Sequence, residues 1–207
     1  MIHRAIEERI HNALAKKKAV TIMGPRQVGK STLADAIIPK DARILEINGD
    51  NTDVQTMFIN VDEAKMKVLI GNKNFLFVDE AQKIENVGNM LKIVAEKFKD
   101  VKIIVTGSSA FKLAEAVNES LTGRKREFRL YPLSFKEMAD ETSTLEESRM
   151  IDHRLIYGYY PEVVTSPGDE KEVLKELIDS YLYKDVMEEN HIAKPDKLVK
   201  LVQALAF

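Results

Sequence analysis

The most informative segment of this sequence is Gly24-Pro25-Arg26-Gln27-Val28-Gly29-Lys30-Ser31. It matches the pattern GxxxxGK[ST], in which backbone amides cradle phosphate groups, the lysine reaches the β- and γ-phosphates and the hydroxyl is a magnesium ligand. The apolar run AVTIM at 19–23 precedes it and the helix-forming run STLADAII at 31–38 follows it, as this mechanism requires. The residues predicted to contact a nucleotide are Gly24, Pro25, Arg26, Gln27, Val28, Gly29, Lys30, Ser31 and Thr32.

Outward from this loop, short apolar runs alternate with helical patterns. The runs FLFV at 75–78 and KIIVT at 102–106 lack a polar–apolar alternation, which is typical of strands buried on both faces of a parallel sheet. Two further strands are predicted at 42–48 and 127–130, and helices at 2–16, at 60–70 with Asn60 as the N-cap, and at 87–98. This order predicts βαβ units with right-handed crossovers and an α/β fold of three layers around a parallel sheet.

A pair of carboxylates ends the strand NFLFVDE at 74–80. Asp79 is predicted to hold magnesium at the carboxyl edge of the sheet. Glu80 is predicted to orient and deprotonate an attacking water, and its alternative is an ordinary carboxylate at a strand end. Because a small-molecule kinase has no use for a hydrolytic base, the pair favours hydrolysis of a nucleoside triphosphate.

Two further candidates lie beside the next two predicted strands, one after a strand and one before a strand. In KIIVTGSSA at 102–110, Ser108 is the first choice for a hydroxyl near the γ-phosphate, ahead of Thr106 and Ser109, unless the segment is only a turn. Arg124 lies on a loop before the run at 127–130, where it could stabilise γ-phosphate charge in the same subunit or across an interface. The alternative is that RKREFR at 124–129 forms a solvated or phosphate-binding basic face.

Composition excludes several classes of protein. The 207 residues carry a formal charge of -2, so contact with nucleic acid would have to be local. The absence of Cys excludes disulfides, a thiol nucleophile and Cys-ligated metals. No apolar stretch approaches a membrane span and the amino terminus is charged throughout, so we expect a cytoplasmic protein. The four histidines show no metal-binding spacing and are expected at the surface: His3, His11, His153 and His191.

The carboxyl-terminal part of the sequence predicts helices alone. An acidic loop is expected at 140–147, followed by helices at 146–157 and 170–188 and by a last helix that begins near Pro195. That last helix is still apolar where the sequence stops, which predicts a truncation and an exposed apolar surface. The predicted domains are a core at 1–140, a small helical lid at 141–190 and the start of a further domain at 191–207.

Taken in order, several motifs resemble one group of AAA+-type P-loop ATPases of archaea and bacteria, which carry an uncharacterised carboxyl-terminal domain after the ATPase. These motifs are GPRQVGKS at 24–31, FLFVDEAQK at 75–83, VTGSS at 105–109, LTGRKREFRLYPLSFKE at 121–137 and GYYPEVV at 158–164. The resemblance spans about residues 2–189. It implies a three-layer P-loop NTPase fold, Walker A at 24–31, Walker B at Asp79 and Glu80, a sensor near Ser108 and an arginine at Arg124.

The leading hypothesis is therefore magnesium-dependent hydrolysis of ATP, with ADP as a product, coupled to a carboxyl-terminal effector domain. ATP is preferred to GTP because no base-specificity motif of the GTPases is evident. The alternative is a nucleotide switch that turns over rarely. A third hypothesis is DNA binding through residues 16–18 and 124–129, which would weaken steeply with salt. A homo-oligomer, and a protein or DNA partner reached through the carboxyl-terminal part, are the expected assemblies.

Overall fold

The computed structural model describes residues 2–58, 61–108, 120–179, 200–201 and 204. The chain divides into two compact units, Met1–Thr144 and Leu145–Phe207. Within the part of the chain that is described, no helix is both long and apolar enough to cross a membrane.

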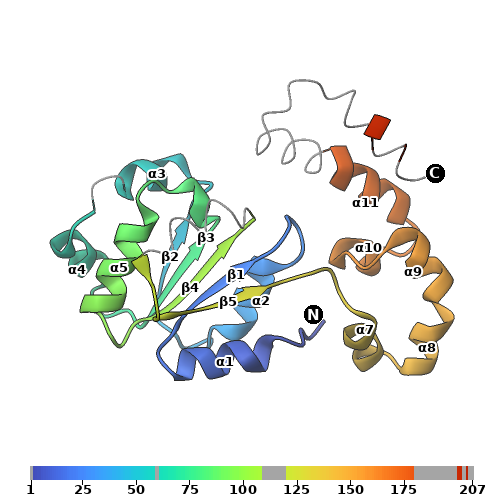
Figure 1. Ribbon diagram of the computed structural model, residues 1–207, viewed down its shortest axis with the longest axis horizontal. Helices are drawn as coiled ribbons and strands as arrows, with labels where there is room; N and C mark the ends of the chain where they lie inside the picture. Colours follow the sequence, from blue (N-terminus) through green and yellow to red (C-terminus); the bar gives the residue numbers. More distant parts are fainter. Residues whose placement is uncertain (1, 59–60, 109–119, 180–199, 202–203, 205–207) are drawn as a thin grey trace. The chain divides into compact units, whose positions relative to one another are not determined.

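A five-stranded sheet forms the centre of the first unit (Figure 1). Its strands are β1 (Ala19–Met23), β2 (Ile44–Asn48), β3 (Phe75–Asp79), β4 (Lys102–Gly107) and β5 (Lys125–Arg129). They lie in the order β2-β3-β4-β1-β5, and every neighbouring pair is parallel. All strands therefore end at one edge of the sheet, the carboxyl edge, and begin at the other, the amino edge. The predicted α/β class with a parallel sheet is confirmed.

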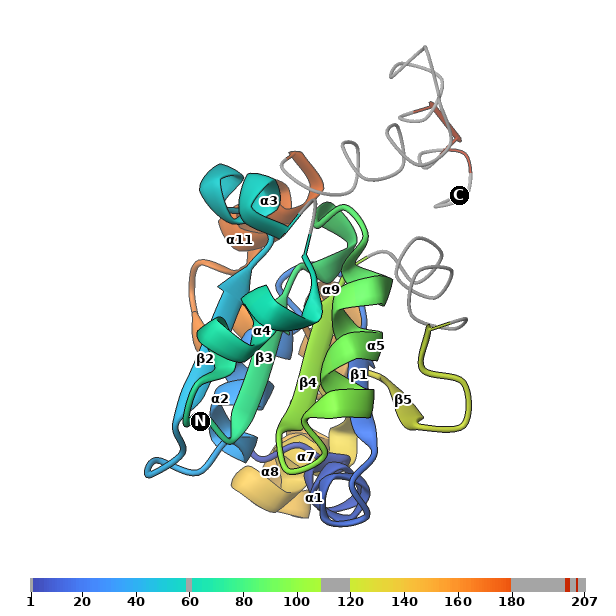
Figure 2. The ribbon, with the colours of Figure 1, turned by 90° about the vertical axis from the view of Figure 1, so that its left-hand side faces the viewer.

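Helices cover both faces of this sheet (Figure 2). On one face lie α1 (Glu7–Ala15) and α2 (Lys30–Ile37), which share a core with the sheet through residues such as Ile10, Leu33 and Ile104. On the other lie α3 (Thr52–Phe58), α4 (Glu63–Ile70) and α5 (Val87–Lys97), with Met66 and Leu91 in a second core. Every residue of β1 is buried, including Thr21, which explains why the strand carries no charged residue.

Several element boundaries differ from the predicted ones. The first helix begins at Glu7 instead of residue 2, because the Glu7 carboxylate accepts a hydrogen bond from the backbone N–H of Arg4 at 2.6 Å. The N-cap of α4 is Asp62, whose carboxylate accepts from the Lys65 N–H at 2.8 Å; Asn60 lies outside the described residues. Helix α3 lies between the predicted strand at 42–48 and the predicted helix at 60–70, and β2 and β5 begin at Ile44 and Lys125 instead of residues 42 and 127.

The segment after β5 is more regular than its acidic sequence predicts. A capping box formed by Ser134 and Glu137 begins α7 (Phe135–Glu141), and α8 (Thr144–Arg149) follows directly, so the predicted acidic loop at 140–147 is wrong. Within the second unit, Glu147 is 2% exposed and pairs with Arg154 at 3.0 Å. A carboxylate that is neutralised by a buried partner belongs to a folded helix pair, not to a solvated loop.

The second unit is helical throughout its described residues. The single helix predicted at 146–157 is divided at Met150 into α8 and α9 (Ile151–Tyr157), and α10 (Pro161–Thr165) and α11 (Glu170–Leu177) follow. His153 of α9 pairs with Glu170 of α11 at 3.2 Å. The rest of the helix predicted at 170–188, together with Pro195 and the terminal residues Val199, Val202 and 205–207, lies outside the described residues.

Candidate functional site

The predicted phosphate-binding residues form the loop from the end of β1 to the start of α2, at the carboxyl edge of the sheet. Its path depends on close packing and on unusual backbone angles. A Cβ on Gly24 would lie 2.3 Å from the carbonyl oxygen of Leu130, so only glycine fits there. Gln27 and Gly29 have φ of 56° and 94°, in the left-handed region. The loop therefore has one fixed conformation that leads into the amino terminus of α2.

Lys30 is the cation of this loop and is only 5% exposed. Its Nζ donates to the carbonyl oxygens of Gly24 at 3.1 Å and Pro25 at 2.9 Å, and lies 3.8 Å from Oε1 of Glu80. A buried ammonium is costly unless it is paired, and these oxygens supply the pairing. Phosphate oxygens can replace them with charge-assisted hydrogen bonds, so the ammonium is already placed for an anionic ligand.

Ser31 and Asp79 meet beside this lysine. The Ser31 hydroxyl donates to Oδ2 of Asp79 at 2.8 Å, and the Thr106 hydroxyl donates to Oδ1 of the same carboxylate. A hydroxyl and a carboxylate in contact are hard oxygen ligands, so this pair fits Mg²⁺, which usually takes one or two protein ligands and completes its shell with phosphates and water. No cluster of three or more acidic or histidine side chains suited to a metal occurs among the described residues. A magnesium ion here would therefore be held together with a nucleotide.

Glu80 follows Asp79 and is a residue of unusual conformation. Its φ is 48°, which is uncommon for a residue other than glycine and costs on the order of 1–3 kcal/mol. A Cβ on Gly49 would lie 2.3 Å from the Glu80 carbonyl oxygen, so this glycine lets the neighbouring strand approach closely. The Glu80 carboxylate accepts a hydrogen bond from the Ser108 hydroxyl at 3.1 Å. The structure thus brings together the predicted base and the predicted hydroxyl; Ser109 lies outside the described residues.

Gln82, which sequence reasoning missed, completes this group. It lies on the 3₁₀ turn Ala81–Lys83, and its Nε2 donates to Oε2 of Glu80 and to the Ser108 hydroxyl, the latter at 2.9 Å. Because a carboxylate only accepts hydrogen bonds, the amide nitrogen must face Glu80. The amide oxygen is consequently turned away, and it is buried with no hydrogen-bond partner in the described part of the chain. The position of Gln82 two residues after the strand-end glutamate is the only sequence signal for it.

Arg124 lies at the amino edge, away from the loop that it was predicted to serve. Its carbonyl oxygen accepts from the N–H of Ala19 at the start of β1, and β1 of five residues separates the two edges by roughly 15 Å. A role beside the phosphate-binding loop of the same chain is therefore excluded. The exposed guanidinium pairs with Glu96 of α5 at 2.8 Å, and this hydrogen bond holds the pKa of the Glu96 carboxyl below its usual range.

Arg4 is a second residue that sequence reasoning missed. Its guanidinium, 7% exposed in the folded chain, donates to the Val28 carbonyl oxygen at 3.0 Å, to the Tyr131 carbonyl oxygen at 2.6 Å and to Glu137 at 3.0 Å. It thus joins the phosphate-binding loop to the segment after β5. Burial raises the pKa of Glu137, but hydrogen bonds from the Ala5 and Ser134 backbone and from Arg4 outweigh it and hold that pKa below 4.5.

Two curated relatives align with more than half of this chain. An uncharacterized protein of Methanocaldococcus jannaschii is 28% identical over 91% of this chain and 46% of its own length. An uncharacterized protein of Haemophilus influenzae is 30% identical over 59% of this chain and 33% of its own length. The chain therefore spans less than half the length of these relatives.

A solved structure shares the fold. A signal transduction ATPase with numerous domains and a tetratricopeptide repeat sensor, from Pyrococcus horikoshii, superposes with a TM-score of 0.53 at 14% identity, over 79% of this chain and 29% of that structure. At this level of identity the likeness concerns the fold, a P-loop arrangement with a parallel sheet.

Family models divide the chain in two. Residues 148–207 match a domain of unknown function. Residues 16–139, which hold the loop, both carboxylates and all five strands, match the model of an AAA domain. This chain accordingly belongs to the AAA domain family, with a domain of unknown function after the AAA domain.

Proposed function

We propose that this chain hydrolyses ATP to ADP and phosphate in a magnesium-dependent reaction. The observation that carries the proposal is the convergence of Lys30, Ser31, Asp79 and Glu80 at one edge of the sheet, within hydrogen-bond or ion-pair reach of one another. A phosphate-binding cation, a pair of magnesium ligands and a carboxylate base are the groups that γ-phosphate hydrolysis needs.

Each side chain has a distinct role in this proposal. The loop amides bind the phosphates, and the Lys30 ammonium exchanges the carbonyl oxygens of Gly24 and Pro25 for β- and γ-phosphate oxygens. Ser31 and Asp79 would hold Mg²⁺, which when bound neutralises negative charge on those oxygens. Glu80 accepts a proton from the attacking water, the new P–O bond forms at the γ-phosphorus, and the bond to the bridging oxygen of ADP breaks.

Glu80 can act as the base only if its carboxylate is held in position. This group must both orient the attacking water and accept its proton. Ser108 and Gln82 donate to one carboxylate oxygen, Oε2, and Lys30 lies near the other, Oε1. When Lys30 turns to the phosphates, Oε1 becomes free to accept from water while Oε2 stays fixed. We therefore assign Ser108 and Gln82 as positioning residues.

A second candidate function is a nucleotide switch with slow turnover. The observation that favours it is that the Glu80 carboxylate is engaged by three side chains, Lys30, Ser108 and Gln82, rather than presented free to water. In both candidates the nucleotide state is transmitted to the carboxyl-terminal domain that follows. The contact of Arg4 with Val28 of the loop and with Tyr131 and Glu137 supports transmission through the segment after β5.

Glu80→Gln separates the two candidates, because it keeps the size of the side chain and removes the base. We expect calorimetry with ATP and Mg²⁺ to show near-normal affinity, while steady-state turnover falls by about 100- to 10,000-fold. Lys30→Ala is the matched loss-of-binding control, since it removes the cation that faces the phosphates. Turnover that is equally slow in the unmodified chain and in Glu80→Gln, with tight ATP binding in both, would establish the switch instead.

A further inference from the structure

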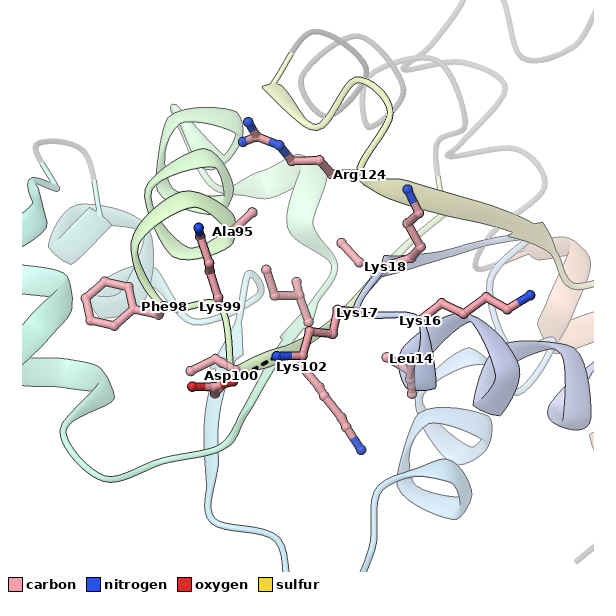
Figure 3. Close-up of a pocket in the computed structure, with 13 residues that line it drawn as sticks. Leu14, Lys16, Lys17, Lys18, Ala95, Phe98, Lys99, Asp100, Lys102 and Arg124 are labelled. Carbon is pink, nitrogen blue, oxygen red and sulfur yellow. Dashed lines mark hydrogen bonds and ion pairs between the residues drawn. The ribbon is translucent and has the colours of Figure 1, made fainter.

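A pocket of about 170 Å³ lies at the amino edge of the sheet, at the opposite end of β1 from the phosphate-binding loop (Figure 3). Three segments far apart in the sequence line it: the turn from α1 into β1, the turn from α5 into β4, and Arg124 before β5. They meet because β1 lies between β4 and β5 in the sheet. We call this the amino-edge pocket.

The amino-edge pocket combines an apolar floor with a cationic rim. The apolar lining residues are Leu14, Ala19, Ala95, Phe98, Val101 and Ile103. The cations around them are Lys16, Lys17, Lys18, Lys99, Lys102 and Arg124, and Asp100 is the acidic residue in the lining. Figure 3 shows the labelled lysine side chains extending in different directions, so their ammonium groups do not follow one line.

Much of this positive charge is not neutralised within the protein. Lys17 pairs with Asp100 at 3.0 Å and Arg124 with Glu96 at 2.8 Å. The ammonium groups of Lys16 and Lys99, both exposed, have no ion-pair partner among the residues that the structure describes. The Lys102 ammonium lies 5.3 Å from the centroid of the Phe75 ring. In a chain whose net charge is -2, this is a local excess that attracts an anionic partner.

We infer that the amino-edge pocket docks an acidic peptide segment of a partner protein, with one large apolar side chain on the floor and carboxylates directed at Lys16, Lys99 and Lys102. Burial of such a side chain changes affinity by roughly 10- to 150-fold, whereas an exposed ion pair changes it by less than about fivefold. The apolar anchor therefore supplies most of the affinity, and the lysines select acidic neighbours.

The same features disfavour a nucleic-acid strand. An extended phosphodiester backbone requires cations arranged along its path, and the lysine side chains of this pocket do not follow one line. Asp100 on the rim is paired with Lys17, and its carboxylate can accept a hydrogen bond from a peptide N–H.

The test is fluorescence anisotropy with the full chain and three labelled probes. The first is a ten-residue peptide of Asp and Glu with one central Phe, the second has Ser in place of that Phe, and the third is a single-stranded DNA of matched charge. We expect the Phe peptide to bind at least about tenfold more tightly than the Ser peptide, because only Phe fills the floor. Equal affinity of the two peptides, or tighter binding of the DNA, would overturn the proposal.

Charge reversal then locates the site. The double variant Lys16→Glu/Lys99→Glu is expected to weaken binding of the Phe peptide by about tenfold or more. The matched control, Lys67→Glu/Lys136→Glu, changes the net charge equally at two exposed lysines outside the pocket and is expected to change affinity less than about twofold. Thermal unfolding of both variants verifies that they fold. Equal weakening by the two double variants would show general electrostatic attraction and no docking site.

Discussion

The two edges of the central sheet use charge in opposite ways. At the carboxyl edge, Lys30, Asp79 and Glu80 are buried or half-buried and are bound to one another or to neighbouring hydroxyls and carbonyls. At the amino edge, Lys16 and Lys99 are exposed on long side chains. A chemical step needs groups held in one geometry, which the first arrangement supplies. In the second arrangement the charges are on long, flexible side chains around an apolar floor, which suits recognition of a partner.

Parallel strand pairing is the cause of this division. β1 takes part in both edges, because Met23 leads into the phosphate-binding loop and Ala19 lies opposite Lys125 at the other end. Residues that follow strands are therefore brought to the carboxyl edge, and residues that precede strands are brought to the amino edge. The comparison predicts that variants at the carboxyl edge change turnover in the subunit that carries them. Arg124 at the amino edge is predicted to affect turnover only in a neighbouring subunit.

The largest expected effect that tests this distinction is that of Arg124→Ala. If Arg124 reaches the γ-phosphate of a neighbouring subunit, the variant should bind ATP normally and lose turnover by about 1,000-fold or more. Specific activity of the unmodified chain should also rise with protein concentration, because the complete site exists only in the assembly. Steady-state turnover and calorimetry measure both quantities.

A mixture of variants provides the control for this prediction. Arg124→Ala subunits supply an intact phosphate-binding loop and Lys30→Ala subunits supply the arginine, so mixing them should restore activity. Arg126→Ala removes an exposed arginine of β5, two residues after Arg124, and should have little effect. Absence of rescue, with a specific activity that does not depend on concentration, would assign Arg124 to the surface of a single chain.

The next largest effect concerns the buried link between the loop and the segment after β5. Arg4→Ala leaves the Glu137 carboxylate, in a residue 8% exposed, without its cation, and loss of one partner of a buried pair costs about 3–5 kcal/mol of unfolding free energy. Urea unfolding of the variant measures this loss. The double variant Arg4→Ala/Glu137→Ala should be less destabilised than the sum of the two single variants, and strict additivity would contradict the pairing.

The pH dependence of stability reports the same link independently. Because the pKa of Glu137 is held below 4.5 in the folded chain, its contribution is present above about pH 4.5 and is lost as the pH falls through the folded value. The unmodified chain should therefore lose more stability than Arg4→Ala as the pH falls from about 4.5 through the folded pKa of Glu137. Parallel pH profiles would show that the two residues do not interact.

The smallest of these effects is that of Gln82→Ala, which tests how rigid the carboxyl edge must be. Loss of a hydrogen bond to a charged group corresponds to roughly a 10- to 100-fold change, which we expect in kcat with little change in KM for ATP. Lys83→Ala, on the same turn but paired with Asp50, is the matched control. A rise in KM with unchanged kcat would place Gln82 in nucleotide binding instead of positioning of Glu80.

Local pattern predicted which groups meet at the carboxyl edge, because each of them sits in a short motif next to a buried strand, as Lys30 and Asp79 do. It failed where a contact joins distant segments. Arg4 and Glu137 are 133 positions apart, and nothing near Arg4 indicates that it is buried. Charge was also a poor guide to exposure: Glu147 was read as part of a solvated loop, yet Arg154 neutralises it inside a helical pair. The place of Arg124 followed from strand order, which periodicity does not provide.

The link through Arg4 also sets an order of events during synthesis of the chain. Arg4, the loop at residues 24–31 and the helix after it leave the ribosome early, but two of the three partners of the Arg4 guanidinium, Tyr131 and Glu137, are made much later. A contact between residues so far apart in the sequence depends on formation of the sheet that lies between them. A nascent chain that ends before residue 131 thus contains the loop and both strand-end carboxylates but lacks two of the groups that hold Arg4 against the loop, so we expect it to bind nucleotide more weakly than the full chain.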